Sequence, residues 1–168
     1  MSKTILAIVS SPRQGGNSEL LVDEFITGAR EAGHTATKVA LREKKLAPCI
    51  ACEACLGNGG ICVQKDDMKE ILDQLIAADV IVLSTPVYYY SISAQLKTMI
   101  DRNKEFYFIA TAADGAHAME CTMNDMQGFV NCVPGSVVKG KVYGSAFRVG
   151  EIKGQSAMKD AYELGKGC

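Results

Sequence analysis

Short apolar runs alternate with longer stretches of helical periodicity along the whole chain, and this alternation restricts the fold more than any other feature. The first run, residues 4–10 (TILAIVS), is apolar and β-branched, as in a parallel strand that is buried on both faces. Further strands are predicted at residues 35–41, 80–84, 105–111 and 142–149. Because parallel strands are joined by right-handed crossovers, the pattern predicts an α/β fold: a doubly wound parallel sheet with helices on both faces.

The segments between these runs carry apolar residues at helical spacing. Asn17 or Ser18 can cap the first helix, which should end near Gly33, and Asp67 and Glu70 have the spacing of a capping box. Further helices are predicted at residues 93–102, 116–130 and 156–164. The chain has 168 residues and contains no repeat or linker, so we expect a single domain with a cysteine-rich loop at residues 48–62.

Charge and hydropathy exclude several classes of protein. Lys and Arg number 18 against 19 Asp and Glu, and this balance argues against a nucleic-acid or anionic-membrane binder. The apolar run near the N-terminus is shorter than the roughly 7–15 residues of a secretory signal, and no run reaches the about 20 of a membrane span. The odd count of seven cysteines does not suit a disulfide framework, so we expect a cytoplasmic protein.

The loop after the first predicted strand has the composition of an anion site. It reads SSPRQGGNS at residues 10–18 and leads directly into a helix. The amides and dipole of a helix N-terminus attract phosphate, Ser11 and Ser18 add hydroxyl donors, and Arg13 can add a charge-assisted contact. The loop has neither the dinucleotide-binding GxGxxG pattern nor the Walker pattern. We interpret it as a phosphate site at the first βα loop of a doubly wound sheet; the alternative is an ordinary strand-to-helix loop.

Three tyrosines at residues 88–90 follow the third predicted strand, directly after Pro86 and Val87. The carboxyl ends of parallel strands meet at one edge of the sheet, so these tyrosines should lie on the same edge as the phosphate loop. An aromatic face with a polar tip suits a flat, partly hydrated heterocycle. The alternatives are that the tyrosines cover the end of the sheet or form a subunit contact. The chain has only two histidines, which disfavours a Cys-His or Ser-His hydrolase.

Three segments resemble the NAD(P)H-dependent FMN reductases, a family of flavodoxin-like flavoproteins. They are SPRQGGNS (residues 11–18), TPVYYYSISAQLKTMIDR (residues 85–102) and KVYGSAFRVGEIKG (residues 141–154). The resemblance implies strand order 2-1-3-4-5, with FMN in the crevice between the first and third strands. It also implies that the flavin carries the chemistry, so no catalytic side chain is expected. The junction at residues 103–104 is shorter than the family usually shows.

The resemblance implies an FMN site built from three loops. Ser11, Arg13, Asn17 and Ser18 would hold the phosphate. Pro86, Val87, Tyr88 and Tyr89 would lie along the isoalloxazine ring and offer backbone amides to its edge. The third loop would be residues 111–115, with Thr111, Asp114 and Gly115 beside the ring. NAD(P)H would be the electron donor, a quinone or a free flavin the acceptor, and the assembly a homodimer or homotetramer.

Four cysteines carry the sharpest chemical signal: Cys49, Cys52, Cys55 and Cys62 have the spacing C-x2-C-x2-C-x6-C. This compact spacing can wrap thiolates around a cubane cluster, whereas structural zinc normally uses two separated pairs. It also resembles the iron-sulfur flavoproteins, which implies that the four bind a [4Fe-4S] cluster. The alternative function is then an iron-sulfur flavoprotein or a flavodoxin-like electron carrier, in which the cluster or a ferredoxin-type partner exchanges electrons with FMN. The alternatives are packing residues, a thiol redox pair, or zinc in a binding module. We interpret the other three cysteines, Cys121, Cys132 and Cys168, as structural or incidental.

Overall fold

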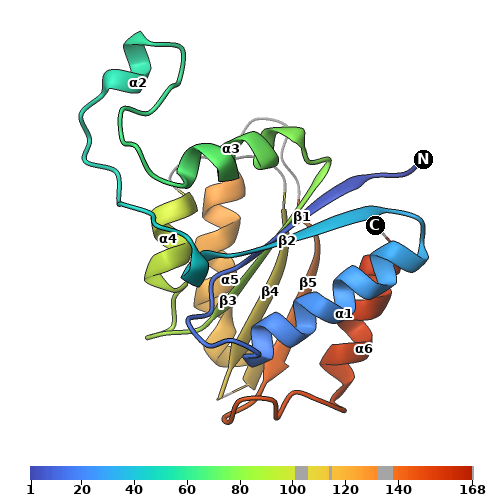
Figure 1. Cartoon of the computed structure of the whole chain (residues 1–168). Coiled ribbons are helices and arrows are strands. Elements are labelled where there is room, and N and C mark those ends of the chain that lie inside the picture. Colours follow the sequence, from blue (N-terminus) through green and yellow to red (C-terminus); the bar gives the residue numbers. More distant parts are fainter. Residues whose placement is uncertain (101–105, 114, 132–137, 168) are drawn as a thin grey trace.

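The computed structural model describes residues 1–100, 106–113, 115–131 and 138–167 (Figure 1). Described segments form a parallel sheet in the order β2-β1-β3-β4-β5. This order confirms the predicted flavodoxin-like, doubly wound sheet. The strands are β1 Thr4–Val9, β2 Thr35–Ala40, β3 Val80–Pro86, β4 Phe106–Ala112 and β5 Val138–Ser145.

Helices cover both faces of the sheet (Figure 1). One face packs against α1 (Asn17–Glu31) and α6 (Ser156–Lys166), with Phe25 of α1 fully buried. The other face packs against α3 (Met68–Ala77), α4 (Ala94–Ile100) and α5 (Gly115–Asn131). A 3-10 helix, η1 (Leu41–Glu43), follows β2. The cysteine-rich segment at residues 48–62, which includes the short helix α2 (Ala54–Gly57), lies on an arm that projects from the body. Within the described residues, no helix combines the length and apolar character that crossing a membrane requires.

Helices α1 and α6 approach each other closely at two glycines. A Cβ atom at Gly165 of α6 would overlap the Phe25 carbonyl oxygen, and one at Gly28 of α1 would overlap the Tyr162 carbonyl oxygen. Side chains at these two positions would therefore push the helices apart. The two glycines allow α1 and α6 to pack backbone against backbone.

The predicted position of the last strand was wrong. We expected residues 142–149, but β5 begins at Val138 and ends at Ser145. Exposed Lys139 and Lys141 alternate with less exposed neighbours, which is the pattern of an edge strand with one solvated face. Residues 146–149 instead belong to the loop between β5 and α6.

Two helix caps also differ from the prediction. The N-cap of α1 is Gly16, so neither Asn17 nor Ser18 caps the helix. Asp67 is the N-cap of α3, but it forms no capping box: its carboxylate accepts from the Lys45 amide, and Glu70 pairs with Lys44. Longer-range partners thus compete successfully with local capping. The predicted short junction at residues 103–104 lies outside the described residues.

Candidate functional site

A cavity of about 300 Å³ opens at the carboxyl edge of the sheet. The loops after β1, β3, β4 and β5 line it. Of the predicted FMN-site residues, the structure places eight around it: Ser11, Arg13, Asn17, Ser18, Pro86, Val87, Tyr88 and Thr111. Tyr89 and Gly115 are not in the lining, and Asp114 lies outside the described residues.

The loop after β1 is tightly folded around Ser11. The Ser11 hydroxyl accepts from the Arg13 amide (3.2 Å), and the Gly16 amide donates to the Arg13 carbonyl (3.2 Å). A Cβ at Gly16 would lie only 2.9 Å from the Ser11 hydroxyl oxygen, so the fold of this loop requires glycine there. The first amides of an α-helix have no acceptor within the helix, and Asn17 and Ser18 bring those of α1 to the cavity. This arrangement fits an anion.

A buried carboxylate lies behind this loop. The Glu19 side chain is only 6% exposed, and its Oε2 accepts from the Gly15 amide (2.9 Å). Arg42 donates to both carboxylate oxygens (3.0 and 3.1 Å), and Lys38 donates to Oε1 (3.1 Å). Burial by itself raises the pKa of Glu19, but the hydrogen bonds from Arg42, Lys38 and Gly15 outweigh it and hold the pKa below its ordinary value. Our sequence reasoning missed Glu19, although an acidic residue in the first turn of this helix was a visible signal.

The side chain of Asn17 joins two loops. Its Nδ2 donates to the Arg148 carbonyl (2.9 Å), and its Oδ1 accepts from the Ile152 amide (3.4 Å). The Glu151 carboxylate accepts from the amides of Arg148 (2.7 Å) and Phe147 (2.8 Å), and these two bonds lower its pKa. The loop between β5 and α6 thereby reaches the cavity. It contributes three lining residues that the sequence prediction missed because it extended the last strand too far: Ala146, Phe147 and Val149.

Buried hydroxyls tie the elements together beneath the cavity. Ser10 donates to the Ser84 carbonyl (2.8 Å), and the Ser84 hydroxyl donates to the Ser18 carbonyl (3.0 Å). The Ser93 hydroxyl donates to that of Ser10 (2.9 Å). This network links β1, β3 and the N-terminal ends of α1 and α4. The network fixes the loop after β1 relative to the loop after β3, and it uses only buried hydroxyl and carbonyl groups.

The tyrosine segment after β3 forms a two-residue hairpin. The amide of Tyr88 donates to the Ser91 carbonyl (3.0 Å), and that of Ser91 donates to the Tyr88 carbonyl (3.1 Å). The turn residues Tyr89 and Tyr90 have φ of 51° and 61°, the left-handed values of a type I′ turn. The Val87 amide donates to the Thr111 carbonyl (2.9 Å). The amides of Val87 and Tyr88 are therefore already engaged, which corrects the expectation that both point at a ring edge.

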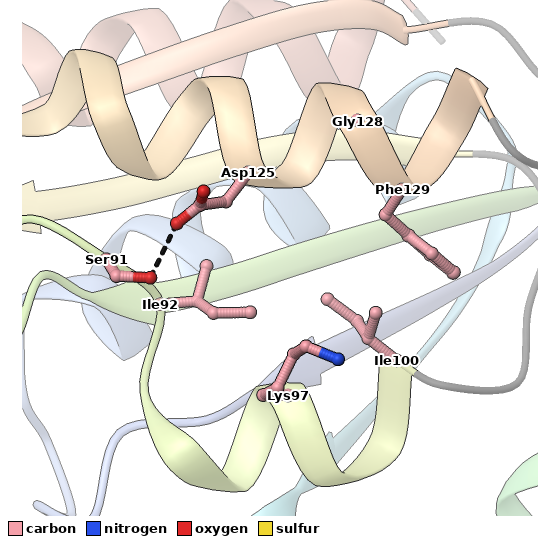
Figure 2. Close-up of a pocket in the computed structure, with 7 residues that line it drawn as sticks. All are labelled: Ser91, Ile92, Lys97, Ile100, Asp125, Gly128 and Phe129. Carbon is pink, nitrogen blue, oxygen red and sulfur yellow. Dashed lines mark hydrogen bonds between the residues drawn. The ribbon is translucent and has the colours of Figure 1, made fainter.

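A second cavity, of about 460 Å³, lies between α4 and α5 (Figure 2). Ile92, Ile100 and Phe129 line it, and Lys97 reaches it from α4. At one end, the Ser91 hydroxyl donates to the Asp125 carboxylate (2.5 Å). This bond anchors the tyrosine hairpin to α5.

The four spaced cysteines lie on the projecting arm. Cys49, Cys52 and Cys55 are exposed, and Cys62 is half-buried. Ala51 and Glu53 have positive φ (51° and 57°), so the arm turns sharply between the first cysteines. Among the described residues, no group of three or more Cys, His, Asp or Glu side chains is arranged to hold a metal ion. The structure therefore places the four thiols on one short arm without assembling them into a ligand set.

Comparison with known proteins identifies the family and the fold of this chain. The sequence profile of the NADPH-dependent FMN reductases matches residues 4–148. The chain belongs to this family. It is similar in structure to an NAD(P)H:quinone oxidoreductase from Methanothermobacter marburgensis (TM-score 0.75, 18% identity, covering 99% of this chain and 96% of that one). It is also similar to an azoreductase from Bacillus anthracis (TM-score 0.75, 16% identity, covering 100% of both chains). At these identities, the two structures establish the fold alone.

Iron-sulfur flavoproteins are among its sequence relatives. One from Methanocaldococcus jannaschii is 36% identical over 126 residues, which is 73% of this chain and 65% of that protein. Another, from Methanosarcina thermophila, is 39% identical over 99 residues, which is 59% of this chain and 51% of that protein. The chain thus spans about half to two thirds of the length of these relatives.

Proposed function

We propose that this member of the FMN reductase family binds FMN in the cavity at the carboxyl edge and passes electrons from NAD(P)H to a small acceptor such as a quinone or a flavin. One observation carries the proposal: the cavity joins a helix N-terminal anion loop to the tyrosine hairpin. A phosphate-bearing aromatic cofactor needs both features within reach of each other.

The chemistry of the cavity suits the two ends of FMN. The α1 amides and the hydroxyls of Ser11 and Ser18 would hold the phosphate, and exposed Arg13 would add charge-assisted hydrogen bonds. Pro86, Val87 and Tyr88 provide an apolar and aromatic wall for a flat ring.

The protein's part in the reaction is to bind and orient. The described lining contains no carboxylate, imidazole or thiol; its hydroxyls belong to serine, threonine and tyrosine side chains. When bound, FMN supplies the redox chemistry by accepting a hydride from a nicotinamide and returning the electrons to an acceptor. The tyrosine hairpin and the Ala146–Val149 segment would shield the ring from water on two sides.

The proposal is tested on the purified chain. Apoprotein is titrated with FMN and with riboflavin by fluorescence quenching, and the holoprotein is then assayed for NADH and NADPH oxidation with a water-soluble quinone. We expect FMN to bind more tightly than riboflavin because only FMN engages the anion loop. Arg13→Gln should narrow this preference by about tenfold, the value of one charge-assisted contact. A chain that binds neither flavin would contradict the proposal.

A second candidate function is electron transfer through a [4Fe-4S] cluster on the cysteine arm. It is favoured by the C-x2-C-x2-C-x6-C spacing on one arm and by relatives named iron-sulfur flavoproteins. Cys49, Cys52, Cys55 and Cys62 would be the ligands, and the arm would have to close to bring their thiols together. A ferredoxin-type protein would then be a partner.

Anaerobic reconstitution with iron and sulfide tests this second candidate. We expect about four iron and four sulfide per chain, with a broad visible absorbance in addition to the flavin bands. Cys55→Ser should abolish this uptake, and Cys121→Ser, outside the motif, should not. About one zinc and no sulfide per chain would contradict the cluster.

The assembly into a homodimer or homotetramer stays a prediction, and analytical ultracentrifugation of the purified chain would test it.

A further inference from the structure

A buried acidic side chain beside a phosphate site calls for a physical explanation. By charge alone, the Glu19 carboxylate repels a phosphate bound at the α1 N-terminus. Lys38 and Arg42 lie on the carboxylate and offset this charge. Charge compensation makes Glu19 tolerable there, but it does not explain what the side chain contributes.

The hydrogen bond from the Gly15 amide indicates what the Glu19 side chain does. Gly15 has φ of 65°, in the left-handed region, and its amide donates to Glu19 Oε2. This bond connects the loop's turn directly to the first turn of α1. Between the two bonded positions lie three of the cavity-lining residues, Gly16, Asn17 and Ser18.

We propose that Glu19 is a positioning residue for the phosphate loop: it holds the Gly15 amide and so fixes the intervening residues for contact with the FMN phosphate. Arg42 holds the carboxylate in one orientation through two hydrogen bonds, and Lys38 adds a third. A planar, bidentate arginine restricts its partner more than a single ammonium contact can. The inference rests on the proposed FMN function.

A carboxylate held in this network is expected to stay ionised. The pKa of Glu19 lies below its ordinary value, so at neutral pH the carboxylate is a full-strength acceptor for the Gly15 amide. Glu19 therefore acts on the phosphate through the loop, not by touching it.

The nearly isosteric Glu19→Gln variant separates positioning from simple charge. Removing a negative charge beside the phosphate should tighten FMN binding if only the local field mattered. If Glu19 positions the loop, the amide disrupts its bonds to Arg42 and Lys38 and the loop loosens. We expect the dissociation constant for FMN to rise about tenfold, from the loss of charge-assisted hydrogen bonds. Riboflavin has no phosphate, so its dissociation constant should change less than about twofold. This small change is easily distinguished from a tenfold rise in the dissociation constant for FMN.

Glu43→Gln is the matched control. Glu43 pairs with the same Arg42 (2.9 Å) but is largely exposed, and among the described residues its carboxylate makes no hydrogen bond or ion pair with the loop. It removes the same charge from the same neighbourhood, and FMN affinity should stay unchanged. Arg42→Lys is a second test that keeps the charge and loses the bidentate geometry; we expect it to weaken FMN severalfold and to leave riboflavin unaffected.

The possible outcomes distinguish a failure of the positioning role from a failure of the proposed function. If wild-type chain binds FMN and Glu19→Gln binds it equally well or more tightly, the positioning role is overturned while the proposed function stands. An equal loss of FMN and riboflavin binding in Glu19→Gln also overturns it, since the side chain would then support the fold as a whole. Wild-type chain that binds neither flavin overturns the proposed function itself.

Discussion

At the scale of single residues, two tyrosines occupy backbone positions that suit glycine. Tyr89 and Tyr90 both have left-handed φ in the hairpin beside the cavity, which for a residue with a Cβ costs about 1–2 kcal/mol. The pairing of Tyr88 with Ser91 and the Ser91 bond to Asp125 hold the turn in place. The strain therefore lies next to the candidate flavin site.

Relief of this strain is measurable at Tyr90, which does not line the cavity. Tyr90→Gly should raise the free energy of unfolding of the apoprotein by about 1 kcal/mol relative to Tyr90→Ala. Both variants lose the ring, but only alanine keeps the cost of positive φ. Urea denaturation of the two variants provides the measurement, and equal midpoints would argue against a type I′ turn here.

The Glu19 carboxylate also predicts a pH dependence of stability. Its folded pKa lies below the unfolded value of about 4.5, so the carboxylate stabilises the fold above that pH. This contribution is lost as the pH falls toward the folded pKa. Glu19→Gln should therefore flatten the acid limb of a plot of unfolding free energy against pH. Lys38, Arg42, Asp23 and Glu43 face the same cluster, so Glu43→Gln is measured in parallel; equal slopes in the two variants would contradict the assignment.

At the scale of elements, the helix that follows the β1 loop packs closely against α6. The loop runs directly into α1, and α1 lies against α6 through Gly28 and Gly165 (Figure 1). A side chain at either glycine would overlap the backbone of the facing helix and push the two helices apart.

Gly165→Ala tests this crossing. The added Cβ would overlap the Phe25 carbonyl oxygen, which is backbone and cannot rotate away. We expect a loss of about 1–3 kcal/mol in the free energy of unfolding, the usual cost of overpacking. Gly128→Ala is the matched control, because a Cβ at that helical glycine meets open space and should stabilise the chain by up to about 1 kcal/mol. Similar midpoints for the two variants in chemical denaturation would show that the helices can yield.

At the scale of the whole molecule, the cavity joins segments that are far apart in the sequence. Asn17 bonds to Arg148 and Ile152, and this staple brings the β5–α6 loop against the first loop. Phe147 and Val149 then form part of the cavity wall. The site is therefore complete only when the last strand and last helix have docked.

Asn17→Ala measures the contribution of this staple. Losing the two hydrogen bonds should loosen the Phe147 wall and raise the dissociation constants for FMN and riboflavin together, by about fivefold, as expected for about 1 kcal/mol. This differs from Glu19→Gln, for which only FMN should respond. Fluorescence titration of both flavins distinguishes the variants, and an effect limited to FMN would assign Asn17 to the phosphate instead.

The fold and the place of the site could be read largely from local patterns. Buried strands such as Thr4–Val9 show continuous apolar runs, and a polar, glycine-containing loop after the first strand is an anion signal that depends on few neighbours. The error in β5 has the same local origin. The strand begins with an alternation that places Lys139 and Lys141 on a solvated face. This alternation is a weaker strand signal than the more apolar stretch that begins at Val142.

The order of strands and helices, the polar loop after the first strand and the spacing of four cysteines follow from local sequence patterns, because periodicity and composition report local burial and turn chemistry. The partners of the polar side chains, in contrast, depend on how the whole chain packs. Asn17 contacts a loop more than 130 residues away, and Glu19 of α1 meets Lys38 on β2 and Arg42 in η1. Such partners follow from how the packed elements bring distant groups within hydrogen-bonding distance, and no local pattern encodes that distance.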